Sequence, residues 1–434
     1  MIADEATNIP IDKVRVLQRK LYRAAKDNPR RKFGVLYDKV HREDVLKQAW
    51  FNVKANRGAA GVDEQSIAAV EQYGVERLLG EIAEVLRKKK YQPLPVRRVY
   101  IPKPNGRQRP LGIPTVIDRV VQAAVKIVIE PIFEAGFADF SYGFRPKRSA
   151  HDALREIYKY INFGCHWVVD ADLKSYFDTI PQDKLILLVR VRVTDRSVIK
   201  LLRLWLEAGV MEDGQVSRSP VGTPQGGVIS PLLANIYLNA LDQRWVRNKL
   251  GDRIHDAHLI RYADDFVILC ARNPEKYLGI AKARLDRLGL TLNSEKTKIK
   301  HVREGFDFLG HTFRLAPSRV TGKMRCYHYP TRKAVASIQR GVKELIQHQQ
   351  HRKTPDLVAQ INPVLRGWGN YFGIGNAKAA FQKVDTYVMY SLCIMLRKKY
   401  KKRSKGWRDH PPNWFYENHG LFSLRKSVTR TLTV

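Results

Sequence analysis

The sequence has 434 residues, a length typical of two or three domains and sufficient to bury a sizeable core. Lys and Arg number 77 against 42 Asp and Glu, a net charge of +35, which indicates a polyanionic partner with nucleic acid as the first candidate. A hydrophobic fraction of 44% and an aromatic fraction of 10% exclude a disordered basic protein, because such chains lack the apolar residues needed to fold.

The predicted elements alternate irregularly between helices and strands up to about residue 315, and the chain is mainly helical from about residue 330. Residues 1–90 are expected to be mostly helical, with breaks at 56–58 and Gly61, followed by a strand over 96–101 that a turn to Gly106 closes. A helix is expected after Pro114, a second helix begins at a capping box at Ser149, and a strand covers 167–173. The next helix has Ser230 as its N-cap and Pro231 at its first position; it is followed by two strands over 258–270 with Asp264 and Asp265 between them, a helix over 278–288 ended by Gly289, and a strand over 306–313. This order predicts an α+β fold rather than a regular βαβ repeat.

The four cysteines lie far apart and form no C-x-x-C pair, so we expect free buried thiols in a reducing compartment and no zinc finger or zinc ribbon. The first residues lack the basic and apolar regions of a signal peptide, and no apolar run reaches the roughly 18 residues of a membrane span. We therefore expect a soluble intracellular protein with no zinc and no membrane partner.

The most informative segment runs from Leu259 to Leu269, where Asp264 and Asp265 interrupt an apolar run. Regular strand geometry sends adjacent side chains to opposite faces, so the two carboxylates can act together only at a hairpin tip. Two like charges ~4 Å apart repel by about 4 kcal/mol at an effective dielectric near 20, unless a cation neutralises them. Such hard oxygen ligands suit Mg²⁺. An ordinary polar turn is the competing interpretation of this segment taken alone.

A second apolar strand, starting at Trp167, also ends in acids, at Asp170, Asp172 and Asp178. A third carboxylate would complete a cage for two metal ions, the device that activates the attacking oxygen and stabilises the leaving oxygen in phosphoryl transfer. Together with the charge of +35, such a cage predicts a nucleic-acid polymerase or nuclease.

The segment Tyr262-Ala263-Asp264-Asp265 resembles the Y-x-D-D box of reverse transcriptases, and the blocks around it resemble that family's blocks in the same order. These blocks are residues 98–114 and 141–146 for the fingers, 172–178, 222–235, 290–298 and 308–310 for the palm, and 366–372 for the maturase thumb. The resemblance is to the bacterial group II intron-encoded reverse transcriptase/maturase family and covers roughly residues 40–400. It implies a right-hand polymerase with an antiparallel palm sheet, followed by an α-helical thumb.

The resemblance implies roles for residues at matching positions. Asp172, Asp264 and Asp265 would be the metal-binding catalytic triad, holding two Mg²⁺ ions, with Mn²⁺ left open as a substitute. Asp170 is the alternative candidate for the first of the three acids. Asp172 is preferred because an aromatic residue, Phe177, follows it five positions later. In the resembling family the aromatic residue at that position forms the bottom of the pocket for the nucleotide sugar. The residues implied to bind the incoming nucleotide are Lys103, Arg109, Phe177 and Gln225. Phe177 could equally be core.

The final quarter of the chain, residues 331–434, carries 20 Lys and Arg against 5 Asp and Glu, which favours a phosphate-contacting surface over a merely solvated one. The residues predicted to bind nucleic acid are Arg366, Lys398, Lys399, Lys401, Lys402 and Arg403. Trp368, Tyr371 and Phe372 have helical spacing, so we expect them to be thumb core first and RNA-stacking platforms second.

The resulting prediction divides the chain into an N-terminal helical extension with the start of the fingers (1–90), fingers and palm (91–315), helical thumb (316–396) and basic tail (397–434). The expected activity is RNA-directed DNA polymerisation on an RNA template and DNA primer with deoxynucleoside triphosphates, combined with binding of a group II intron RNA and its target DNA for splicing and mobility. Two alternatives stay open: a relative recruited to defence or mutagenic copying, and an RNA-binding splicing factor in which polymerisation is secondary.

Many members of the resembling family continue into a zinc-supported endonuclease. No cysteine pair follows Cys393, so second-strand cleavage by this chain is not expected. The expected location is the bacterial cytoplasm, with association with the nucleoid left open, and the sequence leaves the oligomeric state open.

Overall fold

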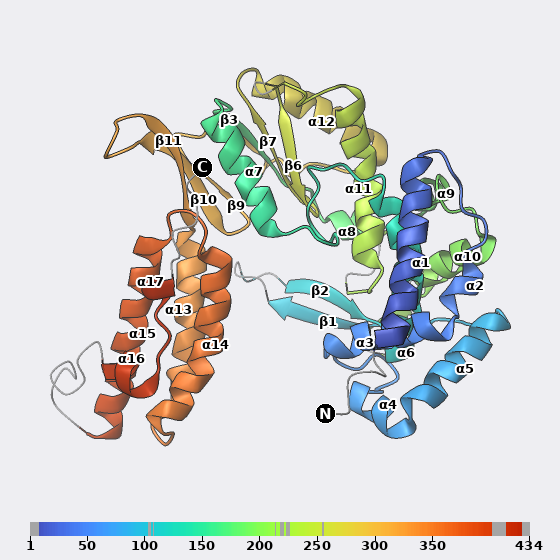
Figure 1. Cartoon of the computed structure of the whole chain (residues 1–434), viewed down its shortest axis with the longest axis horizontal. Helices are drawn as coiled ribbons and strands as arrows, with labels where there is room; N and C mark the ends of the chain where they lie inside the picture. Colours follow the sequence, from blue (N-terminus) through green and yellow to red (C-terminus); the bar gives the residue numbers. More distant parts are fainter. Residues whose placement is uncertain are drawn as a thin grey trace.

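The computed structural model describes residues 8–102, 106, 108–212, 214–217, 221–222, 226–253, 256–401 and 414–427. Figure 1 shows three parts: a helical and sheet-containing part that begins with the N-terminal helices, a central antiparallel sheet with helices on it, and a separate group of C-terminal helices. A small sheet, β9–β11, lies between the central sheet and the C-terminal helices.

The N-terminal part is helical, as predicted. Its helices are α1 (Asn8–Asp27), α2 (Tyr37–Val40), α3 (Glu43–Ala55), α4 (Ile67–Tyr73) and α5 (Val75–Arg87). Helices α1 and α3 pack on α6 (Val116–Glu134), most of whose residues are buried. Each fully buried aliphatic side chain stabilises the fold by roughly 1.5–3 kcal/mol, which makes α6 the centre of this part.

A four-stranded sheet projects from this part with the strand order β2-β1-β4-β5. Its strands are β1 (Val96–Pro102), β2 (Gln108–Ile113), β4 (Val210–Glu212) and β5 (Gln215–Ser217). The predicted strand is present and the chain reverses after it as predicted, but it then returns in a second strand that was not predicted: β1 and β2 pair antiparallel, and residues 103–105 and 107 between them lie outside the described residues.

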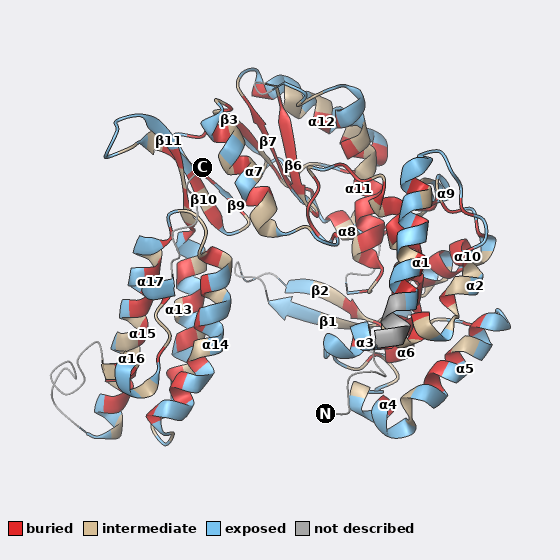
Figure 2. Ribbon diagram, viewed as in Figure 1, coloured by how far each residue is buried: buried red, intermediate tan, exposed pale blue. Residues whose placement is uncertain are grey.

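The central sheet has the order β6-β7-β3-β8, and all of its pairs are antiparallel. Its strands are β3 (Trp167–Ala171), β6 (His258–Tyr262), β7 (Asp265–Cys270) and β8 (Lys298–His301). Figure 2 shows β6 and β7 almost entirely buried, because both faces of the sheet are covered. Strands buried on both faces read as continuous apolar runs, which explains the sequence around the two acids.

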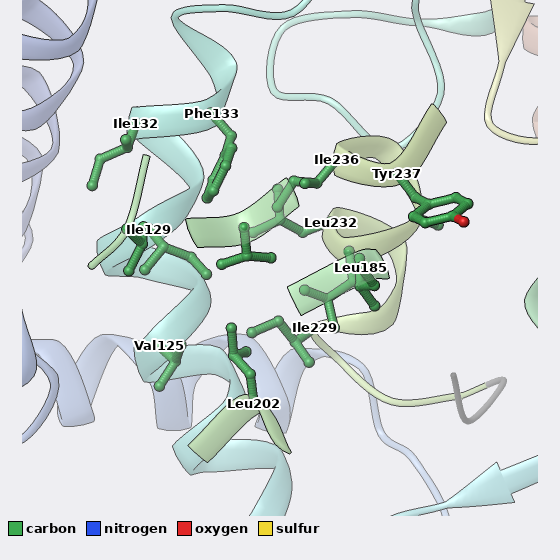
Figure 3. Close-up of a cluster of buried hydrophobic side chains, with 14 of the residues drawn as sticks. Val125, Ile129, Ile132, Phe133, Leu185, Leu202, Ile229, Leu232, Ile236 and Tyr237 are labelled. Atoms are coloured by element: carbon green, nitrogen blue, oxygen red, sulfur yellow. The ribbon is translucent and has the colours of Figure 1, made fainter. Parts of the chain in front are cut away.

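The two faces of the central sheet belong to different cores. Val169, Phe266 and Ile268 face the large core that includes α11 (Ser230–Arg247) and α12 (Pro274–Leu288), whereas Val168 and Val267 face a smaller core with α7 (Ala150–Asn162). Figure 3 shows part of the large core, where α6 and α11 meet side chains from α9 (Gln182–Arg190) and α10 (Arg196–Glu207). The short helix α8 (Tyr176–Thr179) follows β3.

The third sheet corrects one prediction. Residues 306–313 are not one strand but two, β9 (Phe306–Phe308) and β10 (His311–Pro317), which pair with each other, and β11 (Met324–Pro330) pairs with β10. Leu309 and Gly310 both have positive φ, of 47° and 77°, so the chain reverses there in a two-residue turn. The predicted domain boundary at residue 316 therefore falls within β10.

The C-terminal helices begin at Arg332. They are α13 (Arg332–Ile346), α14 (Thr354–Phe372), α15 (Lys378–Lys399), α16 (Trp414–His419) and α17 (Leu424–Ser427). They share a core of their own. The buried carboxylate of Asp385 on α15 accepts hydrogen bonds from the backbone N–H groups of Leu424 and Arg425 and from the hydroxyl of Ser423, which attaches α17.

The α+β prediction and the order of its elements are confirmed. The capping box at Ser149 is present, and Gly289, with φ 76°, ends α12. Ser230 is the first residue of α11 rather than its N-cap, a shift of one position. The four cysteines are buried free thiols, as predicted. In the part of the chain that the structure describes, no helix is both long and apolar enough to cross a membrane.

Candidate active site

The hairpin between β6 and β7 presents the adjacent acids at its tip, as the sequence predicted. Tyr262 pairs with Asp265, so Ala263 and Asp264 form a two-residue turn. Ala263 has φ 58°, a left-handed conformation that costs an L-residue roughly 1–2 kcal/mol. Asp264 is half-buried and Asp265, the first residue of β7, is exposed. We call Tyr262–Asp265 the acidic turn.

Asp172 lies beside the acidic turn because β3 and β7 are neighbours. Ala171 pairs with Phe266, which places the residue after Ala171 next to the residue before Phe266, Asp265. The backbone of Asp172 is held by the segment that follows α12: its carbonyl accepts from the Asn293 N–H at 2.8 Å. Asp172 and the acidic turn, which come from two distant sequence blocks, thus lie at the same end of the central sheet.

These carboxylates act on one another electrostatically. Desolvation of the carboxyl group by the surrounding protein and the charges of Asp264, Asp172 and Asp170 together raise the pKa of Asp265 to about 6, although its side chain reaches solvent, and Lys296 opposes the shift. The pKa of Asp264 is also raised, first by burial and then by the Asp172 charge. A backbone hydrogen bond and the charges of Arg109 and Arg261 oppose this shift without reversing it. A raised pKa means that the ionised carboxylates are unfavourable in this environment, so binding of a cation between them would stabilise their ionised form.

Lys296 forms an ion pair with Asp172. Its Nζ donates to both carboxylate oxygens of Asp172, at 3.1 and 3.2 Å. Lys296 was not among the predicted site residues, although it lies in the 290–298 block, and its place in that block was the available signal. Within the described residues, no three His, Cys, Asp or Glu side chains converge closely enough to form a metal-binding group, and the Asp172 carboxylate is paired with the lysine instead.

Asp170, the competing candidate, lies two residues before Asp172 on β3, so its side chain is on the same face of the sheet. Burial raises the pKa of Asp170 to about 6; Asp172 and Asp307 contribute, and Lys300 and Lys298 oppose them. It lines a cleft of about 470 Å³ between the central sheet and β10, whose other charged residues are Glu295, Lys296, Lys298, Lys300, Glu304, Asp307 and Arg314. Asp170 therefore lines this cleft and is also near enough to the carboxylate cluster for its charge to act on Asp265.

Two of the four residues predicted to bind the nucleotide lie in the described part of the chain. Arg109 is exposed on β2, and its positive charge acts on Asp264. Lys103 and Gln225 lie outside the described residues. Gly226, next to Gln225, has φ 116° and packs so closely on β2 that a Cβ there would lie 2.5 Å from the carbonyl oxygen of Gly112. Backbone contact at Gly226 therefore joins the 222–235 block to the strand that carries Arg109.

Phe177 lies on α8, close in sequence to Asp172. Its side chain is half-buried, packs against the large core, and meets the ring of Tyr176 edge-on at 5.4 Å. The Tyr176 hydroxyl donates to the Ala234 carbonyl at 2.7 Å. Both the core role and the sugar-pocket role therefore remain compatible with its position.

The aromatic residues of the 366–372 block are thumb core, as expected first. Phe372 is buried, and the half-buried Trp368 ring lies 4.7 Å from it. The Tyr371 hydroxyl donates to the Leu309 carbonyl at 2.9 Å, which ties α14 to the turn between β9 and β10. The guanidinium of Arg366 lies over the Phe422 ring at 5.4 Å.

The predicted nucleic-acid-binding run at the end of α15 is only partly described. Lys398 and Lys401 are exposed, and Lys399 donates to the Arg352 carbonyl at 2.6 Å. Lys402 and Arg403 lie outside the described residues.

Comparison with known proteins matches two families to this chain. Residues 101–313 match "Reverse transcriptase (RNA-dependent DNA polymerase)" and residues 335–411 match "Group II intron, maturase-specific domain". The chain is 37% identical over 353 residues to Protein YkfC of Escherichia coli (strain K12), an alignment that covers 71% of this chain and 90% of that protein.

Two further relatives carry intron names. Group II intron-encoded protein LtrA of Lactococcus lactis subsp. cremoris is 32% identical over 350 residues, covering 66% of this chain and 57% of LtrA. Nuclear intron maturase 2, mitochondrial, of Arabidopsis thaliana is 30% identical over 176 residues, covering 31% of this chain and 24% of that protein. The chain thus spans little more than half the length of LtrA.

Proposed function

Because this chain belongs to the family of group II intron reverse transcriptases with a maturase-specific domain, we propose that it is an RNA-directed DNA polymerase that extends a DNA primer on an RNA template. The observation that supports this proposal is the position of Asp172, Asp264 and Asp265 at the same end of the central sheet, where desolvation and the charges of Asp264 and Asp172 raise the pKa of Asp265. A carboxylate cluster in a protein with net charge +35 fits chemistry on a polyanion.

The donor chemistry of this cluster fits hard divalent cations. Asp172, Asp264 and Asp265 would hold two Mg²⁺ ions, with Mn²⁺ as a substitute, and such ions supply activation of the primer hydroxyl and stabilisation of the leaving oxygen. The Lys296 ammonium lies 3.1 Å from one carboxylate oxygen of Asp172, so it would be a close neighbour of ions held there.

The other residues of the proposed site would bind and orient the nucleotide. Arg109 faces the cluster from β2 and would contact the triphosphate, together with Lys103, through charge-assisted hydrogen bonds. Gln225 and Phe177 would lie against the sugar, with Phe177 excluding a 2′-hydroxyl.

We further propose that the chain binds a group II intron RNA and promotes its splicing and its mobility into a target DNA. The maturase-specific match over residues 335–411 and the likeness to LtrA, named as a group II intron-encoded protein, support this role. Residues 331–434 carry a net charge of +15, and phosphate contacts supply much of the affinity for RNA. A bacterial cytoplasmic location follows from this proposal.

Primer extension tests the polymerase proposal. Asp264→Asn keeps the shape of the side chain but removes its charge, so cDNA synthesis with Mg²⁺ on an RNA template should fall at least a hundredfold. The matched control is Asp286→Asn, the same chemical change at an exposed carboxylate on α12, which should leave the rate unchanged. Extension by Asp264→Asn within a few fold of the wild-type rate would refute the site.

Binding separates the two proposed roles. Asp264→Asn should retain its affinity for intron RNA, because the acidic turn supplies no phosphate contact. An Asp264→Asn protein that loses RNA binding along with extension would contradict the division between the carboxylate cluster and the RNA-binding surface.

A further inference from the structure

A charged side chain lies buried directly beneath the acidic turn. Arg261, on β6, is 0% exposed, and so is the side chain of its ion-pair partner Asp242 on α11. The Nε of Arg261 donates to Asp242 at 3.0 Å, and Nη2 donates to the same carboxylate. Nη1 donates to the Oδ1 of Asn235 at 3.0 Å and to the backbone carbonyl of Ala263 at 2.8 Å. Arg261 therefore connects α11 to the backbone of the acidic turn.

The backbone around Arg261 is held from the other side by residues 140–143. The Arg261 N–H donates to the Phe140 carbonyl at 2.9 Å, and the Arg261 carbonyl accepts from the Tyr142 N–H at 2.8 Å. Gly143 lies against the acidic turn so closely that a Cβ there would lie 2.3 Å from the Ala263 nitrogen. Asn235 Nδ2 donates to the Gly143 carbonyl at 2.8 Å, so Asn235 holds Gly143 and Arg261 at once.

Three sequence blocks that are far apart in the chain thus meet in one buried polar network: residues 140–143, residues 235–242 on α11, and residues 261–263. The network ends at the carbonyl of Ala263, the residue with the left-handed backbone that precedes Asp264. Two neighbouring carboxylates that repel each other need their backbone held from outside, because their own interaction drives them apart.

Stability alone does not account for this arrangement. Replacing a buried ion pair by apolar side chains of similar volume is often neutral or stabilising, so a fully buried Arg–Asp pair is weak evidence for a role in stability. A guanidinium in a fixed fork is, however, well suited to holding a carbonyl in one place while its other donors are anchored.

We propose that Arg261, anchored by Asp242 and Asn235, is a positioning residue that holds the backbone of the acidic turn so that Asp264 and Asp265 face Asp172. The proposal rests on the proposed function, since it concerns the same carboxylate cluster. Arg261 does not touch the substrate; it acts through the Ala263 carbonyl. Loss of the network should therefore lower metal affinity and turnover while leaving the binding of primer and template nearly unchanged.

The main test uses the double variant Arg261→Met/Asp242→Leu. This variant removes one positive and one negative charge together, so the net charge near the carboxylates stays the same and neither buried charge is left unpaired. Mn²⁺ binding followed by electron paramagnetic resonance, with Asp264→Asn as the reference for loss of the site, measures metal affinity without relying on activity. Primer extension gives kcat and KM separately.

We expect the double variant to fold, to bind Mn²⁺ at least tenfold more weakly, and to lose at least tenfold in kcat with KM for the primer–template within a factor of two. The control is Asp195→Ala, which removes the N-cap of α10 and its hydrogen bonds to Leu36 and Tyr37, far from the turn in the fold. A folded double variant with wild-type Mn²⁺ affinity and kcat would overturn the proposal, and so would an equal loss in Asp195→Ala.

A second variant decides the matter if the double variant does not fold. Asn235→Ala removes one of the two anchors and leaves the ion pair intact, so it should fold and lower Mn²⁺ affinity and kcat by about threefold or more. Values equal to those of the wild type would overturn the proposal. If the wild-type protein fails to extend any primer, the polymerase proposal fails, whereas the Mn²⁺ measurements still test the positioning role.

Discussion

The carboxylate cluster should make the metal-free protein less stable than it would be without one of its acids, and Asp265→Asn measures this. Burial and the neighbouring carboxylates raise the pKa of Asp265 from 3.8 to about 6. A shift of roughly two units corresponds to at most about 3 kcal/mol, at about 1.4 kcal/mol per unit. The side chain of Asp265 reaches solvent, which screens these charges, and Asp170, whose pKa is also raised, shares the interaction. We therefore expect Asp265 to lower the free energy of unfolding by about 1 kcal/mol.

The sign and the pH range follow from the direction of the shift. Below about pH 4 the Asp265 carboxyl group is protonated in both the folded and the unfolded chain, so it does not change the free energy of unfolding. Between pH 4 and 6 this carboxyl group ionises in the unfolded chain before it ionises in the folded one, so the free energy of unfolding falls as the pH rises. Above pH 6 to 7 the group is ionised in both states, and the loss of stability is constant. Asp265→Asn should therefore be more stable than the wild type at pH 8, with an advantage that shrinks towards pH 4.

The assay is urea denaturation in EDTA followed by tryptophan fluorescence, since Trp167 on β3 and Trp245 on α11 lie in or against the central sheet. Millimolar Mg²⁺ should stabilise the wild type and remove the advantage of the variant. Asp152→Asn is a control of opposite sign: burial acts to raise the pKa of Asp152, but hydrogen bonds from Ser149 lower it overall, so its loss should destabilise the protein at pH 8. An Asp265→Asn protein that is less stable than the wild type at pH 8 without metal, or an advantage independent of pH, would refute the reasoning.

Three further substitutions test other parts of the site. Phe177→Val should admit ribonucleotides in primer extension by opening space at the sugar; equal rejection by wild type and variant would assign Phe177 to the core alone. Lys296→Ala removes a charge that lowers the pKa of Asp265, so the acid limb of the pH–rate profile should move to higher pH, and an unmoved limb would contradict that coupling. Replacing the basic run at the end of α15 by alanine should weaken intron RNA binding and flatten its salt dependence, while short-primer extension changes less; an unchanged affinity and slope would reject this run as the RNA site. The five residues replaced are Lys398, Lys399, Lys401, Lys402 and Arg403.

The acidic turn was predictable because it breaks a simple pattern. An apolar run interrupted by two acids can be satisfied only where strand alternation ends, and β6 and β7 do meet there in a two-residue turn. The helical start of the chain, the capping box at Ser149 and the glycine that ends α12 were predictable for the same reason, since caps and periodicity are local properties. The turn at Leu309 and Gly310 was not predicted, because Leu309 adopts a left-handed backbone conformation that leucine rarely adopts.

Sequence alone determined the α+β class and placed two adjacent acids at a turn between strands, because local periodicity and turn chemistry depend on neighbouring residues; the catalytic role of the acids stays a prediction. Only the tertiary structure decided what surrounds those acids: Lys296 pairs with Asp172, Asp170 and Lys296 line the neighbouring cleft, and Arg261 is buried beneath the turn. Arg261 was not among the predicted site residues, although an arginine inside an apolar strand is unusual. Its side-chain partners on α11 lie 19 and 26 residues earlier in the chain, and its backbone partners lie in residues 140–143, so these groups come together only when the helices and the sheet pack.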